Sequence, residues 1–210
     1  MKPHEIEAKS FAIIDQEAGP HNFAPDEWTI VRRMIHTTAD FEYMEMTRFS
    51  GDAVAAGIKA IRNGFTVITD TNMAKAGIRK GPLAAFGGRC ECLMADPQVA
   101  AEAKKRGVTK AHVAVEHARF MMKNGIYVVG NAPTALLRLL DMINKRQAEP
   151  ALVVGLPVGF VNAAESKADL MKTGIPYISN VGRKGGSNVA ASVINALALI
   201  AGEKIAGERR

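Results

Sequence analysis

Five short runs rich in Val, Ile, Leu and Tyr constrain the fold of this chain more than any other feature. Most are continuously apolar rather than alternating, which is the pattern of strands buried on both faces of a parallel sheet. Stretches with a helical pattern separate them. We expect strands at residues 65–69, 90–94, 126–129, 151–154 and 177–179, and helices at 97–106, 110–123, 133–145, 163–172 and 188–201. This alternation predicts an α/β domain with three α/β/α layers and a mainly parallel sheet.

The first sixty residues have a different pattern. Pro25 opens a helix that carries acids in its first turn, and a second helix is expected at 51–62 with Ser50 as its N-cap and Gly64 as its stop. We interpret this region as an N-terminal helical cover packed on the sheet. There is no linker-like stretch and no internal repeat, so we expect residues 1–210 to form one domain, with 203–210 as a frayed tail.

The charge balance favours an anionic small molecule as ligand. Lys plus Arg exceed Asp plus Glu by 27 − 21 = +6, but the basic residues are dispersed in short clusters and form no dense stripe interleaved with aromatic residues. Nucleic-acid binding is therefore disfavoured. The longest apolar stretch, 189–201, is too short to span a bilayer, and the charged start of the chain lacks the apolar segment of a signal peptide. We expect a cytoplasmic protein with no membrane partner.

Four loops that follow predicted strands contain Asn, Ser or Thr, and three of them also contain glycine. They span residues 69–72, 130–134, 155–162 and 182–188. Ligands of open parallel sheets bind beyond the carboxyl ends of the strands, where glycines let backbone approach and helix N-termini favour anions. Tight turns and N-caps are the alternative explanation for each loop. The last loop, GRKGGSN, is the strongest anion signal, with Arg183, Lys184 and Ser187 at the start of a helix.

Known nucleotide and metal signatures are missing. The chain has neither a Walker A loop nor a G-x-G-x-x-G pattern, which disfavours a nucleotide-dependent enzyme on the same architecture. Cys90 and Cys92 form a single C-x-C without a second ligand pair. His112 and His117 are five residues apart, a poor spacing for two ligands on one helical face. We therefore expect no metal site, and no Ser/His/Asp triad can be assigned.

His36 is the candidate for proton transfer. Histidine exchanges its proton near neutral pH, and Arg33 lies three residues earlier on the same face of the predicted helix. The alternative is a helix-terminal histidine that only complements the helix dipole. The residues by themselves leave both interpretations open.

Eight motifs, in order along most of the chain, resemble the precorrin-8X and cobalt-precorrin-8 methylmutase family. They are SFAII (10–14), RMIHTTAD (33–40), TDTNM (69–73), AFGG (85–88), GNAPTAL (130–136), PVGF (157–160), AAESK (163–167) and GRKGGSN (182–188). The resemblance implies a homodimer with a flavodoxin-like fold. It also implies an isomerase of cobalamin biosynthesis that moves a methyl group from carbon 11 to carbon 12 of a tetrapyrrole, with no cofactor. Cobalt, where present, is carried by the substrate.

The resemblance also implies site residues. The family's catalytic histidine falls on His36, and its substrate-binding serine and arginine fall on Ser10 and Arg33. Further candidates for substrate carboxylates are Lys110, Asn131, Arg183, Lys184 and Ser187. Many relatives have Arg where this chain has Lys110, and lysine lacks the bidentate fork of arginine.

Three alternatives remain beside the cobalt-precorrin-8 methylmutase that the motifs favour. One is the metal-free enzyme that converts precorrin-8X to hydrogenobyrinate. Another is a corrinoid carrier that keeps the same pocket without turnover. The nucleotide-dependent enzyme is the third. Transient contact with neighbouring enzymes of the pathway is a further expectation.

Overall fold

A six-stranded mixed sheet is the centre of the protein. The computed structural model describes the backbone of residues 3–208 and the side chains of residues 5–203. In the order β1-β6-β5-β4-β2-β3, β1 pairs antiparallel with β6 and all other neighbours are parallel. The strands are β1 (Thr47–Phe49), β2 (Val67–Thr69), β3 (Cys90–Glu91), β4 (Ile126–Val129), β5 (Leu152–Gly155) and β6 (Tyr177–Asn180). The predicted α/β class and mainly parallel sheet are confirmed.

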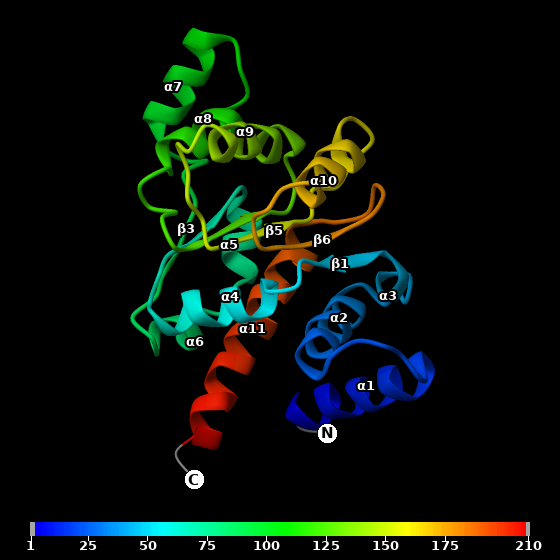
Figure 1. The fold of residues 1–210 in the computed structure, drawn as a ribbon. Coiled ribbons are helices and arrows are strands. Elements are labelled where there is room, and N and C mark those ends of the chain that lie inside the picture. The colour runs from blue at the N-terminus through cyan, green and yellow to red at the C-terminus, as the bar shows by residue number, and fades with distance from the viewer. Residues whose placement is uncertain (1–2, 209–210) are drawn as a thin grey trace.

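Helices cover both faces of the sheet (Figure 1). On one face lie α8 (Lys110–His117), α9 (Pro133–Asn144) and α10 (Ala163–Met171), with α7 (Pro97–Arg106) packed on α8. On the other face lie α4 (Ala53–Arg62) and the long α11 (Ser187–Glu208), and α11 also contacts α2 (Pro25–Thr38), α5 (Asn72–Gly77) and α6 (Lys80–Ala84). The remaining helices are α1 (Pro3–Ala18), which packs on α2, and the short α3 (Tyr43–Met46).

The central strands β4 and β5 are continuously apolar because each contributes to two cores. In β4, Ile126 and Val128 belong to the core shared with α2, α4 and α11, whereas Tyr127 and Val129 belong to the core under α8, α9 and α10. All four are at most 1% exposed. Successive side chains of a strand point to opposite faces, so a strand covered on both faces needs apolar residues at every position.

The strand order places a topological switch point between β2 and β4. From β2 the chain moves outward to β3, and from β4 it moves the other way through β5 to β6. With β1 set aside, this is the flavodoxin-like order, in which ligands bind at the carboxyl ends of the strands beside the reversal. The four loops singled out in the sequence follow β2, β4, β5 and β6 at this edge.

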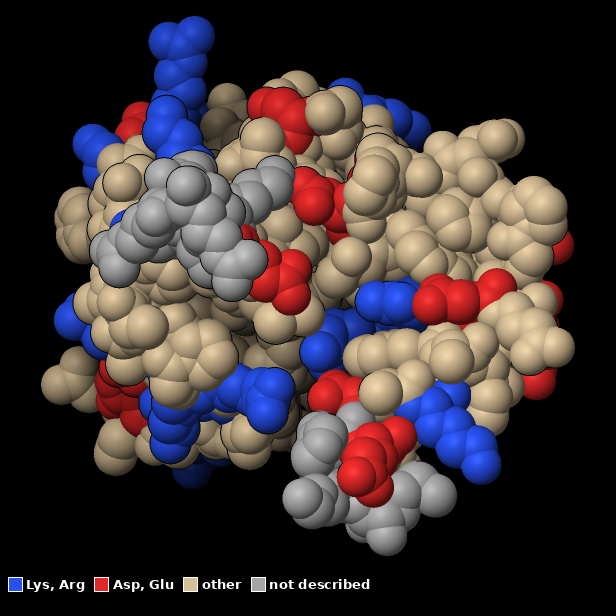
Figure 2. All heavy atoms as spheres, turned by 90° about the horizontal axis from the view of Figure 1, so that it is seen from below, with Lys and Arg blue, Asp and Glu red and all other residues tan. Residues whose placement is uncertain are grey.

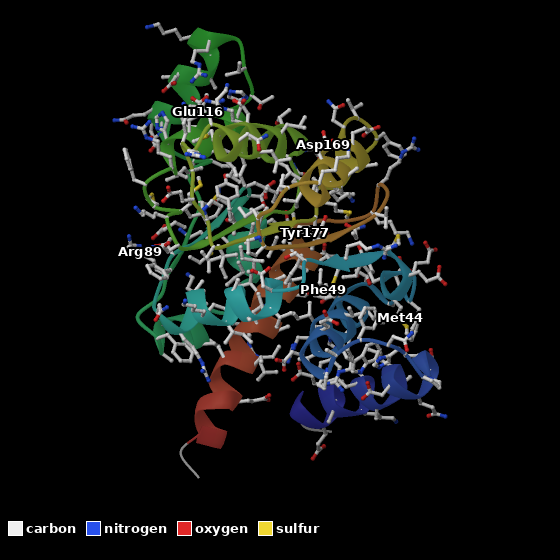
Figure 3. All side chains as sticks on the ribbon, in the orientation of Figure 1. Met44, Phe49, Arg89, Glu116, Asp169 and Tyr177 are labelled. Carbon is white, nitrogen blue, oxygen red and sulfur yellow. The ribbon has the colours of Figure 1, made fainter. Side chains whose placement is uncertain are left out.

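The N-terminal cover is confirmed as helical, and this part of the chain also adds a strand to the sheet. Helix α2 packs along α11 through its buried stripe Ile30, Val31, Met34 and Ile35. The chain then passes through α3 and adds β1 to the edge of the sheet, an element that the sequence did not predict. Met44 of α3 and Phe49 of β1 lie beside α2 in Figure 3 and pack against the same core.

Three predicted details were wrong. Ser50 does not cap α4, whose N-cap is Asp52. The Ser50 hydroxyl instead accepts the Tyr177 N–H at 2.9 Å and so connects this segment to β6. The helix predicted for 110–123 ends at His117 and continues as turns. The last helix does not end near Gly202, because α11 extends to Glu208. Residues 209 and 210 of the predicted tail lie outside the described part of the chain.

The surface charge follows the dispersed pattern of the sequence. On the face seen in Figure 2, Lys and Arg lie in separate groups with Asp and Glu between them. Among the helices within residues 3–208, none combines the length and apolar character required to cross a bilayer.

Candidate active site

His36 lies in the last turn of α2, on the side of the helix that faces away from the core. The preceding residue Ile35 is 1% exposed, whereas His36 is exposed. The helix ends at Thr38, and its C-cap residue Ala39 adopts a left-handed conformation (φ 53°) and donates its N–H to the Ile35 carbonyl at 2.7 Å. The buried stripe of α2 therefore determines that the imidazole points outward.

A pocket of about 390 Å³ lies between α1 and the end of α2. From α1 it is lined by Ser10, Ile13, Ile14 and Glu17, and from α2 and the following turn by Ile35, His36, Ala39 and Phe41. The α1 residues follow the spacing i, i+3, i+4, i+7, which places them on one face of a helix. Ser10 and His36, expected from the motifs, are thus brought into one pocket.

Arg33 is not among the residues that line this pocket. Its Nη1 is 3.3 Å from Glu7 Oε1, and its guanidinium stands over the Phe11 ring at 5.2 Å. The same Phe11 ring lies 5.0 Å from the His36 ring. Phe11 therefore connects the two predicted residues, and Arg33 has to leave Glu7 before it can reach a ligand.

The loop after β6 is joined to the segment after α2. Lys184 Nζ lies 2.5 Å from Asp40 Oδ2 and 3.0 Å from Glu42 Oε2. The hydrogen bond from Lys184 lowers the pKa of the Asp40 carboxyl, and the same bond raises the pKa of Lys184. Lys184 therefore has protein partners in this structure. Its neighbour Arg183 is exposed and stands over the Phe160 ring at 5.5 Å.

A buried lysine donates a hydrogen bond to the backbone of the same loop. Lys167 of α10 is 1% exposed, and its Nζ donates to Asn180 Oδ1 at 3.1 Å and to the Lys184 carbonyl at 2.6 Å. Burial lowers the pKa of Lys167 to about 8. The loop also contacts the one after β5, because Gly186 N–H donates to the Leu156 carbonyl at 2.9 Å.

A buried carboxylate organises the loop after β4. Asp70, 1% exposed, accepts the backbone N–H groups of Gly130, Asn131 and Ala132 at 2.8, 2.9 and 2.7 Å. Burial raises its pKa, and these hydrogen bonds oppose the shift. The expectation that the N–H groups of this loop bind an anion is therefore wrong at these three residues. The Asn131 residue itself is exposed.

The other two sequence candidates lie at this edge of the sheet but not in the His36 pocket. Ser187 is 7% exposed, and its Oγ lies 2.7 Å from Thr71 Oγ1. Lys110 is exposed at the start of α8, next to Thr109, whose Oγ1 is 3.1 Å from Thr134 Oγ1. Ser187 is thus held by the start of α5, and Lys110 adjoins the loop after β4.

Residues 5–203 contain no group of three His, Cys, Asp or Glu side chains arranged to hold a metal ion. The two histidines of α8 instead face glutamates. His112 Nε2 is 3.2 Å from Glu116 Oε1, and His117 Nε2 is 2.7 Å from Glu102 Oε2. Glu116 lies in the upper helical layer in Figure 3, and it also pairs with Arg106 and Arg138. This cluster connects α7, α8 and α9.

Sequence reasoning missed six of the pocket residues. They are Ile13, Ile14, Glu17, Ile35, Ala39 and Phe41. A signal for the first three was present, because they continue from Ser10 at helical spacing. Phe41 and Ala39 carry no such signal, since the left-handed turn at Ala39 determines their positions.

Replacing Asp70 by asparagine is expected to destabilise the protein by about 1–3 kcal/mol. The amide NH₂ would take the place of one carboxylate oxygen, so the backbone N–H groups that this oxygen accepts would lose their acceptor. Urea unfolding of the purified variant measures this. The matched control is Asp169→Asn, since Asp169 is 51% exposed and pairs only with Lys172 among the described residues (Figure 3). Equal effects of the two substitutions would contradict the role given to Asp70.

Comparison with known proteins identifies relatives over nearly the whole chain. Residues 5–200 match the family model described as CbiC, precorrin-8X methylmutase. The cobalt-precorrin-8 methylmutase of Priestia megaterium is 45% identical, covering 96% of this chain and 89% of the relative. That of Salmonella typhimurium is 46% identical, covering 94% and 95%. The crystal structure of precorrin-8x methyl mutase from Thermus thermophilus is 47% identical, with a TM-score of 0.90 over 96% of this chain and 97% of that one.

Proposed function

The chain belongs to the precorrin-8X methylmutase family, and from this premise we propose that it is a cytoplasmic cobalt-precorrin-8 methylmutase, an isomerase of cobalamin biosynthesis. It moves a methyl group from carbon 11 to carbon 12 in ring C of the macrocycle and gives cobyrinate. The bond from the methyl to carbon 11 breaks as the bond to carbon 12 forms, so the step has no net redox change. Nucleotide and flavin have no part in this step, and any cobalt is part of the substrate.

His36 is the general acid of the proposal. It donates a proton to the ring system, which draws electron density away and allows the methyl to migrate in a [1,5]-sigmatropic shift, and it recovers the proton afterwards. The observation that carries this role is the shared pocket, since an exposed imidazole and the Ser10 side chain face one cavity from two helices. A positioned acid typically contributes about 10²–10⁴-fold, and a fixed geometry of the macrocycle contributes further.

The substrate carries acetate and propionate side chains, and the proposal assigns them to polar groups around the pocket. Ser10 and Arg33 are the first candidates, the latter after exchange of Glu7 for a substrate carboxylate. Arg183 and Lys110 are exposed cations without an ion pair among the described side chains. Asn131 and Ser187 offer neutral hydrogen bonds, and Ser187 has to share its hydroxyl with Thr71.

A homodimer is part of the proposal. The pocket of one chain is open and measures about 390 Å³, near the lower end of the range of about 300–1,000 Å³ for small-molecule sites. A four-ring macrocycle with its acid side chains requires more space and more cover than that. The loop after β5 also exposes Phe160 (84%) and Val161 (76%), and a second copy that covers these side chains would remove apolar surface from water. Sedimentation equilibrium is expected to give twice the chain mass.

Incubation of the purified protein with cobalt-loaded and with metal-free precorrin-8 tests the proposed activity. We expect the visible spectrum to change to that of the corrin product, faster with the cobalt-loaded substrate. Two of the similar proteins described above are named cobalt-precorrin-8 methylmutase and one precorrin-8x methyl mutase. Preference for the metal-free substrate would indicate the enzyme that converts precorrin-8X to hydrogenobyrinate. Tight product binding without any spectral change would instead support a corrinoid carrier.

A further inference from the structure

The segment that follows His36 is held by contacts from a different part of the chain. The C-cap residue of helix α2 is Ala39, a non-glycine residue in the left-handed region, and such a conformation persists only where surrounding contacts hold it. The next residue, Asp40, accepts the Glu42 N–H at 3.0 Å with one oxygen and contacts Lys184 with the other. Asp40 is four residues from His36, so these contacts anchor the chain directly after the last turn of α2.

Lys184 is itself fixed from within the protein. Its carbonyl accepts two hydrogen bonds, from Lys167 Nζ at 2.6 Å and from Asn180 Nδ2 at 2.9 Å. Lys167 and Asn180 are at most 1% exposed. A lysine backbone held by two buried donors has little freedom to move, which leaves its side chain to bridge outward to Asp40 and Glu42.

On these contacts, and resting on the proposed methylmutase activity, we propose that Lys184 is a positioning residue for His36 rather than a ligand of a substrate carboxylate. It joins the buried base of the loop after β6 to the turn after α2. The sequence alone favoured the other role, because two cations within a glycine loop resemble an anion site. In the structure the ammonium contacts two protein carboxylates, and a substrate acid would have to compete with both.

The two roles differ in their kinetics. Lys184→Met removes the ammonium but keeps an unbranched side chain. If Lys184 positions His36, kcat falls about tenfold while KM changes less than about twofold, because a small misplacement of a catalytic group lowers the rate of the chemical step. If Lys184 binds substrate, KM rises in Lys184→Met, and Asp40→Asn, which removes one of the two carboxylates that compete for the ammonium, lowers KM.

A double-mutant cycle gives a second discrimination. We expect Asp40→Asn to lower kcat less than Lys184→Met, since Glu42 remains as a partner, and we expect the double variant to resemble Lys184→Met alone. Independent, multiplicative effects of the two substitutions would overturn the proposal. Lys172→Met is the matched control, because Lys172 is exposed and pairs with one carboxylate, Asp169, at 2.9 Å. Its kinetics should equal those of the unaltered protein.

One measurement separates this inference from the proposed activity. The ring carbon and proton resonances of ¹³C-labelled His36 report its surroundings without any turnover. We expect them to shift in both Lys184→Met and Asp40→Asn, and to stay unchanged in Lys172→Met. If the resonances do not shift in the first two variants, the positioning role is overturned. If they shift but the unaltered protein shows no turnover, only the proposed activity is overturned.

Discussion

His36→Ala is expected to lower kcat for the methyl shift by about 10²- to 10⁴-fold, the contribution of a positioned general acid. Affinity for the product should change little, because the pocket retains Ser10 and the apolar side chains of α1. Stopped-flow spectra of the corrin chromophore measure the rate, and titration with cobyrinate measures the affinity. The loss should be in kcat because the imidazole acts on the transition state rather than on the bound acid groups.

His117→Ala is the matched control for this prediction. His117 also stands in the last turn of a helix, α8, and its Nε2 contacts Glu102 at 2.7 Å, away from the His36 pocket. Its replacement is expected to leave kcat unchanged. A His36→Ala variant that retained full turnover would show that the histidine only complements the dipole of α2.

Lys167→Met is expected to change how stability depends on pH. The pKa of Lys167 is lowered by burial from 10.5 to about 8. Between these two values the unfolded chain binds more protons at this site than the folded protein, so stability rises with pH in that window. The rise attributable to Lys167 is at most about 3 kcal/mol. Below pH 8 both states are protonated, and the full cost of the buried charge is present.

The methionine variant lacks this titration. Its free energy of unfolding should therefore exceed that of the unaltered protein most clearly at pH 7, and the difference should shrink towards pH 10. The variant also lacks the Lys167 ammonium that donates to Asn180 Oδ1, and this loss makes the increase in the free energy of unfolding smaller. The Lys184 carbonyl keeps its hydrogen bond from Asn180 Nδ2. Urea unfolding at pH 7, 8, 9 and 10 provides the comparison. Parallel curves for the two proteins would refute the assigned ionisation.

The fold was predictable wherever local sequence and tertiary environment agree. The strand predicted at 126–129 is found at those residues, because cover on both faces requires the apolar run that the sequence shows. Strand β1 was missed because Thr47–Phe49 is only three residues long and pairs with residues 178–180, far along the chain. Nothing local distinguishes such a segment from a loop.

The site was predictable only in part. Ser10 and His36, which the motifs indicated, line one pocket in the structure, whereas Arg33 is not among its lining residues and is paired with Glu7. The glycine loops were interpreted as free backbone donors. Asp70 binds the N–H groups of Gly130 to Ala132, and this long-range contact leaves no signal in a single sequence. The same holds for Lys167, which sequence reasoning placed in a motif without a role.

The two outermost strands restrict how a second copy of the chain can attach. At one margin of the sheet β1 has three residues, and at the other β3 has two. Margins this short present few unpaired backbone groups, which protects against accidental strand addition between molecules. In the proposed dimer, the partner chain is therefore expected to associate through side-chain surfaces of helices and loops, without a continuous intermolecular sheet.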